Sequence, residues 1–445
     1  MSKLLIQGAQ LVNEGSITKQ DVLIEGERIA QIAPAIAITN EMEVISAHGK
    51  FLLPGCIDDQ VHFREPGLTH KADIGSESKA CAAGGITSYL EMPNTNPQTT
   101  TAEAYANKLS IAGQTSWVNY GFMFGGTNDN LDAIKAIDPK KTPALKLFLG
   151  SSTGNMLVDN PDTLKGIFSA FRLPIAVHCE DENTIRENTS HYIEKFGDDI
   201  PIVHHPDIRS EEACYLSSSK AIALAKETGA RLHVFHLSTA RETNLFSNTL
   251  PLAKKQITSE VCIHHLWFSD EDYATKGTHI KWNPAVKTKK DREGLWEALN
   301  DDRIDIIATD HAPHTLDEKN QVYTKAPSGG PMVQHALPVL LECIQQGKIT
   351  LEKVVEKMCH NPAILFSIED RGYIRSGYFA DLVLVDMDLA QTVTRENILY
   401  KCGWSPLEGT RLRGSVTHTI INGRLLYKEG DFVDQPNAKA LTFNR

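Results

Sequence analysis

The sequence Gln60-Val61-His62-Phe63-Arg64-Glu65 closes an apolar run that begins at Phe51 and is typical of a buried strand. A second apolar run, at residues 304–308, leads into Ala308-Thr309-Asp310-His311-Ala312-Pro313-His314. Both stretches end in side chains that bind metal ions, and the strand ends of a closed barrel bring such side chains to one point. We therefore expect the two stretches to form opposite edges of one metal site.

The middle of the chain alternates predicted strands with amphipathic helical segments. The candidate strands are short and apolar, and they occupy residues 56–62, 86–92, 117–124, 144–149, 174–179, 231–237, 257–263 and 304–310. Helical segments such as residues 162–171 and 210–228 separate them, and Gly229 is a helix-ending signal. Eight strands with helical connections favour an α/β fold in which a (β/α)8, TIM-like metal-dependent hydrolase barrel spans residues 53–366.

Both ends of the chain have a different pattern, with short alternating strands separated by turn residues. This pattern covers residues 3–29 and returns at residues 377–386 and 416–427, where Asn422-Gly423 predicts a hairpin turn. We expect residues 1–52 and 367–445 to build one small, composite β-sandwich domain.

Composition narrows the class of protein. The chain has 445 residues, of which 41% are hydrophobic and 23% charged, as in an ordinary soluble globular protein. Its net charge of −11 argues against nucleic acid or an anionic membrane as a partner. No apolar stretch reaches the roughly 18 residues of a membrane helix, and the start of the chain shows no secretory signal. Eight scattered cysteines without a CxxC pair predict reduced thiols in the cytoplasm.

Several predicted strands end in potential metal ligands, at the end of the barrel where active sites lie. Gln60 and His62 are two residues apart and therefore face the same side of their strand. The other strands supply the donors Lys146, His178, His236 and Asp310. His233 is an odd number of residues before His236, so we expect it to face the helices and to serve packing.

Lys146 lies inside an apolar predicted strand, where a charged amine is costly to bury. A neutral or carbamylated amine would remove that cost. The alternative is a salt bridge to Asp310 or Glu180.

Six stretches match the sequence motifs of a known protein family: Pro54 to Asp58, Val61 to Gly67, Ala83 to Thr87, Met92 to Pro97, Gly229 to Ala240, and Thr309 to His314. In these stretches the chain resembles a dihydroorotase of the long, bacterial-type class within the amidohydrolase superfamily. The subfamily resemblance rests mainly on Arg64, Asn94 and His314.

The resemblance implies reversible cyclisation of N-carbamoyl-L-aspartate to (S)-dihydroorotate in de novo pyrimidine biosynthesis. It implies one or two Zn²⁺ ions per subunit and a zinc-bound hydroxide that attacks the ring amide carbonyl. Asp310 would move the proton between this water and the leaving nitrogen. The metal ligands that it implies are His62, Lys146 as N6-carboxylysine, His178, His236 and Asp310.

The family also implies substrate contacts and partners. The substrate-binding residues would be Arg64, Asn94, Asn283 and His314, and a loop that includes Ser152 and Thr153 would close on the substrate. A homodimer and an association with aspartate carbamoyltransferase are further expectations from the resemblance.

Two departures from the family pattern leave alternatives open. Gln60 replaces the first metal histidine, so its amide either completes the metal site or orients His62 or Asp310 by a hydrogen bond. Lys146 stands where many long-class members have an aspartate. The competing functions are a hydantoinase or allantoinase, whose substrates need no carboxylate for Arg64, and a catalytically silent subunit that scaffolds aspartate carbamoyltransferase. Retention of the other metal ligands argues against the silent subunit.

Overall fold

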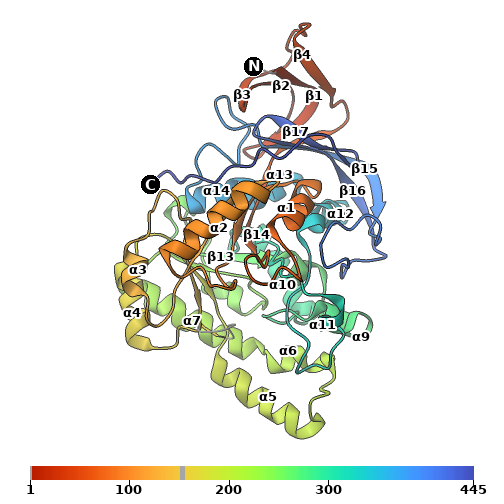
Figure 1. Ribbon diagram of the computed structural model, residues 1–445. Coiled ribbons are helices and arrows are strands. Elements are labelled where there is room, and N and C mark those ends of the chain that lie inside the picture. Colours follow the sequence, from red (N-terminus) through yellow and green to blue (C-terminus); the bar gives the residue numbers. More distant parts are fainter. Residues whose placement is uncertain (1–2, 151–155) are drawn as a thin grey trace.

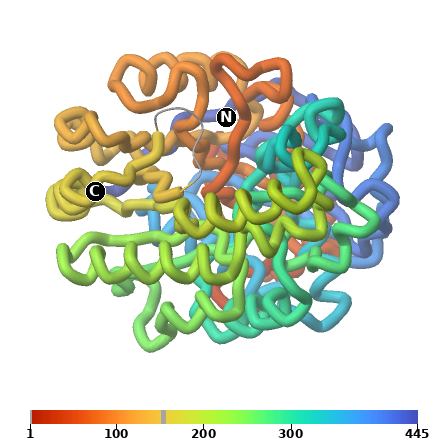
Figure 2. Tube along the Cα trace, turned by 90° about the horizontal axis from the view of Figure 1, so that it is seen from below, coloured from red at the N-terminus to blue at the C-terminus, as the bar shows by residue number. Residues whose placement is uncertain are grey.

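The structure is a computed structural model that describes residues 3–150 and 156–445. A barrel forms the lower part of the molecule in Figure 1, and a β-sheet domain lies above it. Seen from below, the chain winds round a common centre from orange through yellow and green to teal (Figure 2), as successive strand–helix units of a barrel do. The predicted α/β architecture of a TIM-like barrel with a sheet domain is confirmed.

The barrel strands are all parallel and correspond to the predicted ones: β6 (Cys56–Val61), β7 (Ile86–Glu91), β8 (Asn119–Phe122), β9 (Phe124–Gly125), β10 (Leu145–Phe148), β11 (Ile175–His178), β12 (Leu232–Val234), β13 (Ile257–Cys262) and β14 (Ile306–Ala308). They form a six-stranded and a three-stranded sheet, and β8 and β9 continue one barrel strand that Met123 interrupts. A parallel bridge between Val61 and His311 joins β14 to β6 and closes the ring.

The helices surround this ring: α1 (Ile74–Ala83), α2 (Ala102–Thr115), α3 (Leu131–Lys135), α4 (Pro161–Ala170), α5 (Glu182–Phe196), α6 (His205–Ile208), α7 (Glu211–Thr228), α8 (Ile263–Trp267), α9 (Tyr273–Lys276), α10 (Lys289–Asn300), α11 (Leu316–Lys319), α12 (Ala336–Gln345), α13 (Leu351–Val355) and α14 (Asn361–Phe366). Local signals set their ends. The Ser210 hydroxyl caps α7, and Gly229 ends it at a φ of 76°. None of the helices in the two described ranges has the length and apolar character of a membrane span.

The second domain takes strands from both ends of the chain into one sheet: β1 (Lys3–Asn13), β2 (Ser16–Glu25), β3 (Arg28–Ala33), β4 (Met42–Ser46), β5 (Phe51–Pro54), β15 (Leu382–Thr392), β16 (Arg411–Ile421), β17 (Arg424–Lys428) and β18 (Asp431–Phe432). Its order is β18-β17-β16-β15-β5-β1-β2-β3, with β4 paired to β1. The predicted hairpin at Asn422-Gly423 is confirmed, because both residues have positive φ between β16 and β17.

An apolar cluster fills the inside of the barrel where its strands begin. Ile57, Ala176 and Ile306 contribute to it from the strands. Leu441 and Phe443 join them from the end of the chain, where the Leu441 N–H donates to the Tyr120 carbonyl. This end of the barrel is therefore sealed, and access to the interior is from the opposite end.

Candidate active site

A cavity of about 530 Å³ opens at the C-terminal ends of the barrel strands. Every predicted site residue outside the 152–153 loop lines it: Gln60, His62, Arg64, Asn94, Lys146, His178, His236, Asn283, Asp310 and His314. Ser152 and Thr153 lie outside the described residues. The strand ends thus bring together side chains from β6, β7, β10, β11, β12 and β14, as the barrel prediction requires.

One edge of the cavity is formed by His62, Asn94 and Asp310. The His62 Nδ1 lies 2.7 Å from the Asn94 amide oxygen, which can only accept a hydrogen bond. The proton of a neutral His62 is therefore on Nδ1, and its Nε2 lone pair faces an Asp310 carboxylate oxygen at 3.2 Å. Burial lowers the pKa of His62 against the opposing effect of Asp310. A lone pair and a carboxylate at this distance are suited to binding one cation.

The opposite edge is formed by His178 and His236. Their ring nitrogens Nδ1 and Nε2 lie 3.0 Å apart, close enough to bind one ion together. The Nε2 of His178 lies 3.1 Å from Glu180. Burial opposes ionisation of Glu180, but Arg209 and His178 outweigh it and lower its pKa to about 2. The charged Glu180 carboxylate beside His178 favours a proton on Nε2 of this imidazole, which leaves Nδ1 as the nitrogen that can bind an ion.

Lys146 lies between these two edges and is fully buried. Its Nζ has no hydrogen-bond partner within residues 3–150 and 156–445, and it lies 4.0 Å from the centre of the Phe235 ring. Burial lowers the pKa of Lys146 to about 7, so much of the amine is neutral at neutral pH. The alternative of a salt bridge to Asp310 or Glu180 is not found among these residues. An unpartnered, nucleophilic amine between the His62–Asp310 edge and the His178–His236 pair fits the metal site that the sequence predicts.

Arg64 and His314 lie together at the rim of the cavity. The Nε of Arg64 donates to the Pro313 carbonyl at 3.1 Å, and its guanidinium lies 3.1 Å from His314. Burial and then Arg64 hold the pKa of His314 well below its usual range, so this imidazole is neutral. Lys71, which the sequence reasoning missed, lies 3.0 Å from His314 Nδ1. Arg64 therefore points a fixed charge at the cavity and can bind a carboxylate.

Comparisons with known proteins show the family of the chain. Residues 51–426 match the model of the amidohydrolase family. The chain belongs to this family. It is 35% identical to a dihydroorotase of Halobacterium salinarum over 93% of this chain and 94% of that one. It is 32% identical to an allantoinase of Desulfitobacterium hafniense over 98% of both. Among solved structures, an L-hydantoinase (dihydropyrimidinase) from Arthrobacter aurescens superposes with a TM-score of 0.92 at 27% identity, covering 99% of this chain and all of that one.

Membership in the family confirms the predicted superfamily and the prediction of an enzyme. The fold of the relatives also confirms the barrel with its β-sandwich. The roles of the individual residues of this amidohydrolase stay predictions.

Gln60 stands at the position where the family resemblance implies a metal-binding histidine. Its side chain is buried, lines the cavity and accepts a weak hydrogen bond from the Cys262 thiol, with Sγ 3.6 Å from Oε1. In the described part of the chain it makes no hydrogen bond to the side chain of His62 or Asp310. The amide oxygen is thus available to a metal ion, which supports ligation over a purely orienting role.

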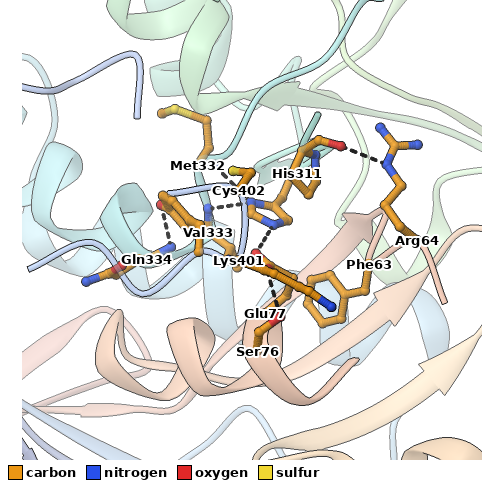
Figure 3. Close-up of polar contacts among 12 residues, drawn as sticks. Phe63, Arg64, Ser76, Glu77, His311, Met332, Val333, Gln334, Lys401 and Cys402 are labelled. Carbon is orange, nitrogen blue, oxygen red and sulfur yellow. Dashed lines mark hydrogen bonds and ion pairs between the residues drawn. The ribbon is translucent and has the colours of Figure 1, made fainter. Parts of the chain in front are cut away.

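A second buried network holds Asp310 in place, and sequence reasoning missed it. His311 Nδ1 accepts the backbone N–H groups of Met332 and Val333 at 3.0 and 3.2 Å, so its proton is on Nε2 and is donated to Glu77 at 2.8 Å (Figure 3). The His311 carbonyl in turn accepts the His62 N–H at 2.7 Å. Asp310 has a φ of 45°, a left-handed conformation that is uncommon outside glycine. The network therefore fixes the turn that presents the Asp310 carboxylate.

The predicted orientation of His233 is wrong. His233 lies inside the barrel, where its Nδ1 is 2.9 Å from Thr258 Oγ1 and its Nε2 is 3.4 Å from Asp59 and Glu260. The strand β12 ends at Val234, and His236 has a φ of 39°, so regular alternation stops between the two histidines. Both therefore point inward, although an odd number of residues separates them.

Replacement of Gln60 by histidine tests its place at the metal site. We expect Gln60→His to raise the affinity for the metal ion at the His62–Asp310 edge about tenfold or more, because changes that only orient a ligand already alter metal affinity about 10–100-fold. Turnover should persist. Titration of Zn²⁺ into apo-enzyme measures the effect, with Gln60→Ala as the comparison. Two equally tight sites in the parent, unchanged in both variants, would show that this position contributes nothing to ligation.

Proposed function

We propose that this amidohydrolase is a dihydroorotase, which interconverts N-carbamoyl-L-aspartate and (S)-dihydroorotate. The proposal rests mainly on the position of Arg64. This buried cation faces the cavity that also holds the potential metal-binding side chains at the strand ends. Burial lowers its pKa to about 10, so it stays charged at neutral pH. Dihydroorotate has a ring amide and a carboxylate, and this cavity offers a partner to each.

The proposed metal ligands are His62, His178, His236, Asp310 and Lys146 as a carbamate, with the Gln60 amide beside them. Their nitrogen and oxygen donors suit one or two Zn²⁺ ions. A carbamate would form by attack of the neutral Lys146 amine on CO₂, with loss of one proton, and would turn an unpartnered base into an anionic bridging ligand. Zinc held there would supply an activated water at neutral pH and polarise the amide carbonyl.

The chain's own residues then bind the substrate and move the proton. Arg64 binds the substrate carboxylate, with the neutral His314 and the Asn283 amide beside it. Asp310 accepts the proton of the attacking water. When the ring C–N bond breaks, Asp310 returns this proton to the leaving nitrogen. In the direction of ring closure the same carboxylate takes a proton from the carbamoyl nitrogen and gives it to the departing water.

A hydantoinase or allantoinase is less well supported, because such substrates need not carry the carboxylate that Arg64 would bind. A catalytically silent subunit has no need to keep the unpartnered Lys146, the paired histidines and Asp310 in one cavity.

Replacement of Arg64 tests the substrate class. Arg64→Ala should weaken productive binding of dihydroorotate by about 2–4 kcal/mol, or roughly 30–1000-fold in kcat/KM, because a buried charge loses its partner. The metal content should stay at the parent level. Arg241→Ala, which removes an arginine from the surface ion pairs with Glu211 and Glu212, is the control and should have no effect. If dihydroorotate turnover survives Arg64→Ala while the parent turns over hydantoin or allantoin, the substrate assignment is wrong.

A further inference from the structure

A second cluster of potential metal-binding side chains lies inside the barrel beside the cavity, and none of its residues lines the cavity. It consists of Asp59 on β6, His233 on β12 and Glu260 on β13. All three side chains are fully buried. Asp59 is in the middle of β6 immediately before Gln60, so the same strand contributes to both sites.

The tautomer of His233 is set by its neighbour Thr258. The Thr258 hydroxyl donates its only proton to the Leu232 carbonyl at 3.1 Å. It can therefore only accept from His233 Nδ1, which lies 2.9 Å away. A neutral His233 then has its Nε2 lone pair directed at Asp59 and Glu260. Three electron-rich groups face one another without solvent, and this arrangement requires a positive charge between them.

A proton on His233 Nε2 is one source of this charge. Burial opposes it, but Asp59 and Glu260 outweigh burial and raise the pKa of His233 to about 9. The spacing of the three groups nevertheless suits a metal ion better than a proton. His233 Nε2 lies 3.4 Å from Asp59 Oδ2 and 3.4 Å from Glu260 Oε2. Charge-assisted hydrogen bonds span about 2.7–2.9 Å. Two ligands bonded at about 2.0–2.1 Å to a tetrahedral zinc ion lie about 3.3 Å from each other. The observed separations therefore match two edges of a zinc coordination tetrahedron.

Asp59 supplies an independent observation. Neither of its carboxylate oxygens has a hydrogen-bond partner in the described ranges, although the side chain is fully buried. Buried carboxylates in native proteins are almost always hydrogen-bonded, paired with a cation or bound to a metal. Glu260, by comparison, uses its other oxygen to accept the His236 N–H at 3.3 Å and keeps Oε2 for the cluster.

We propose that Asp59, His233 and Glu260 bind a divalent transition-metal ion in a structural site separate from the cavity. Their nitrogen and oxygen donors suit zinc. Two carboxylates and one neutral imidazole balance the charge of a divalent ion, and a water molecule is left for the fourth position. The ion would link β6 to β12 and β13 across the barrel interior. This site does not depend on the substrate assignment.

Metal content of the purified protein, reconstituted with Zn²⁺ and dialysed, tests the proposal. Asp59→Asn keeps the size of the side chain and removes its charge, and it should contain one equivalent of zinc per chain less than the parent. Glu242→Gln is the matched control, because Glu242 is also a buried carboxylate but is hydrogen-bonded by Ser218 and Thr239, and its zinc content should equal that of the parent. Equal zinc content in Asp59→Asn and the parent would overturn the proposal.

A measurement on the parent protein covers the case in which Asp59→Asn does not fold. Anomalous diffraction at the zinc edge should show a peak between His233 Nε2 and the two carboxylates, in addition to the signal from the cavity. A cavity peak without a peak at the Asp59–His233–Glu260 cluster would equally overturn the proposal.

Discussion

Replacement of Asp310 by asparagine is expected to lower dihydroorotate turnover about 10²–10⁴-fold, the usual contribution of a positioned general acid–base. Asparagine has the same shape but cannot accept the proton of the attacking water or return it to the ring nitrogen. The effect should fall on kcat, because the carboxylate lies beside His62 in the cavity and not at the Arg64 rim. Steady-state kinetics of dihydroorotate hydrolysis measures it.

The same substitution at a nearby exposed position is the control for Asp310. Asp317 lies seven residues after Asp310 in the chain and is exposed in α11, so Asp317→Asn should keep the kinetics of the parent. A kcat of Asp310→Asn within a few-fold of the parent, at equal metal content, would exclude Asp310 as the residue that moves the proton.

Replacement of Lys146 by alanine should have an effect of similar size through a different cause. The variant should lose at least one metal ion and about 10³-fold or more in turnover, because a bound metal contributes several kcal/mol to stabilising the transition state. The buried amine has no hydrogen-bond partner in the residues that the structure describes, so its removal breaks no such bond. Metal analysis and turnover on the same preparation measure the two losses.

Chemical rescue separates the proposed carbamate from a packing role of Lys146. Short carboxylic acids such as acetate and propionate should restore part of the activity of Lys146→Ala, because they replace the missing anionic ligand. Lys165→Ala, at an exposed lysine paired with Glu227, should neither lose activity nor respond to these acids. Density at high resolution showing a free ammonium group at Lys146 beside two bound metal ions would contradict the carbamate.

Local patterns were enough to predict the architecture of the barrel and the ring of polar side chains at its open end. The apolar runs gave the strands, and parallel strands in a closed barrel must place their C-terminal residues together. Lys146, His178 and Asp310 therefore line one cavity, as expected from strand ends that are far apart in sequence.

Local sequence patterns could not predict features that depend on single backbone torsions or on contacts between residues far apart in the chain. His233 faces the interior from β12, and the positive φ of His236 breaks the alternation after that strand, so both histidines point inward, and nothing in the residue types of β12 signals it. The bond between Glu77 and His311 joins residues 234 positions apart. The sequence could have indicated the role of Asp59, since an acidic residue beside Gln60 in an apolar strand needs a buried partner.

Turnover of three cyclic amides by the parent enzyme is the most direct test of the dihydroorotase assignment. The zinc-loaded protein should be assayed at neutral pH with dihydroorotate, hydantoin and allantoin under the same conditions. We expect kcat/KM for dihydroorotate to exceed that for the other two substrates by about 100-fold or more, because a site with a buried charge for the substrate carboxylate discriminates strongly against rings that lack it. Equal or better turnover of hydantoin or allantoin would show that the dihydroorotase assignment is wrong, as would zinc-loaded protein that turns over none of the three.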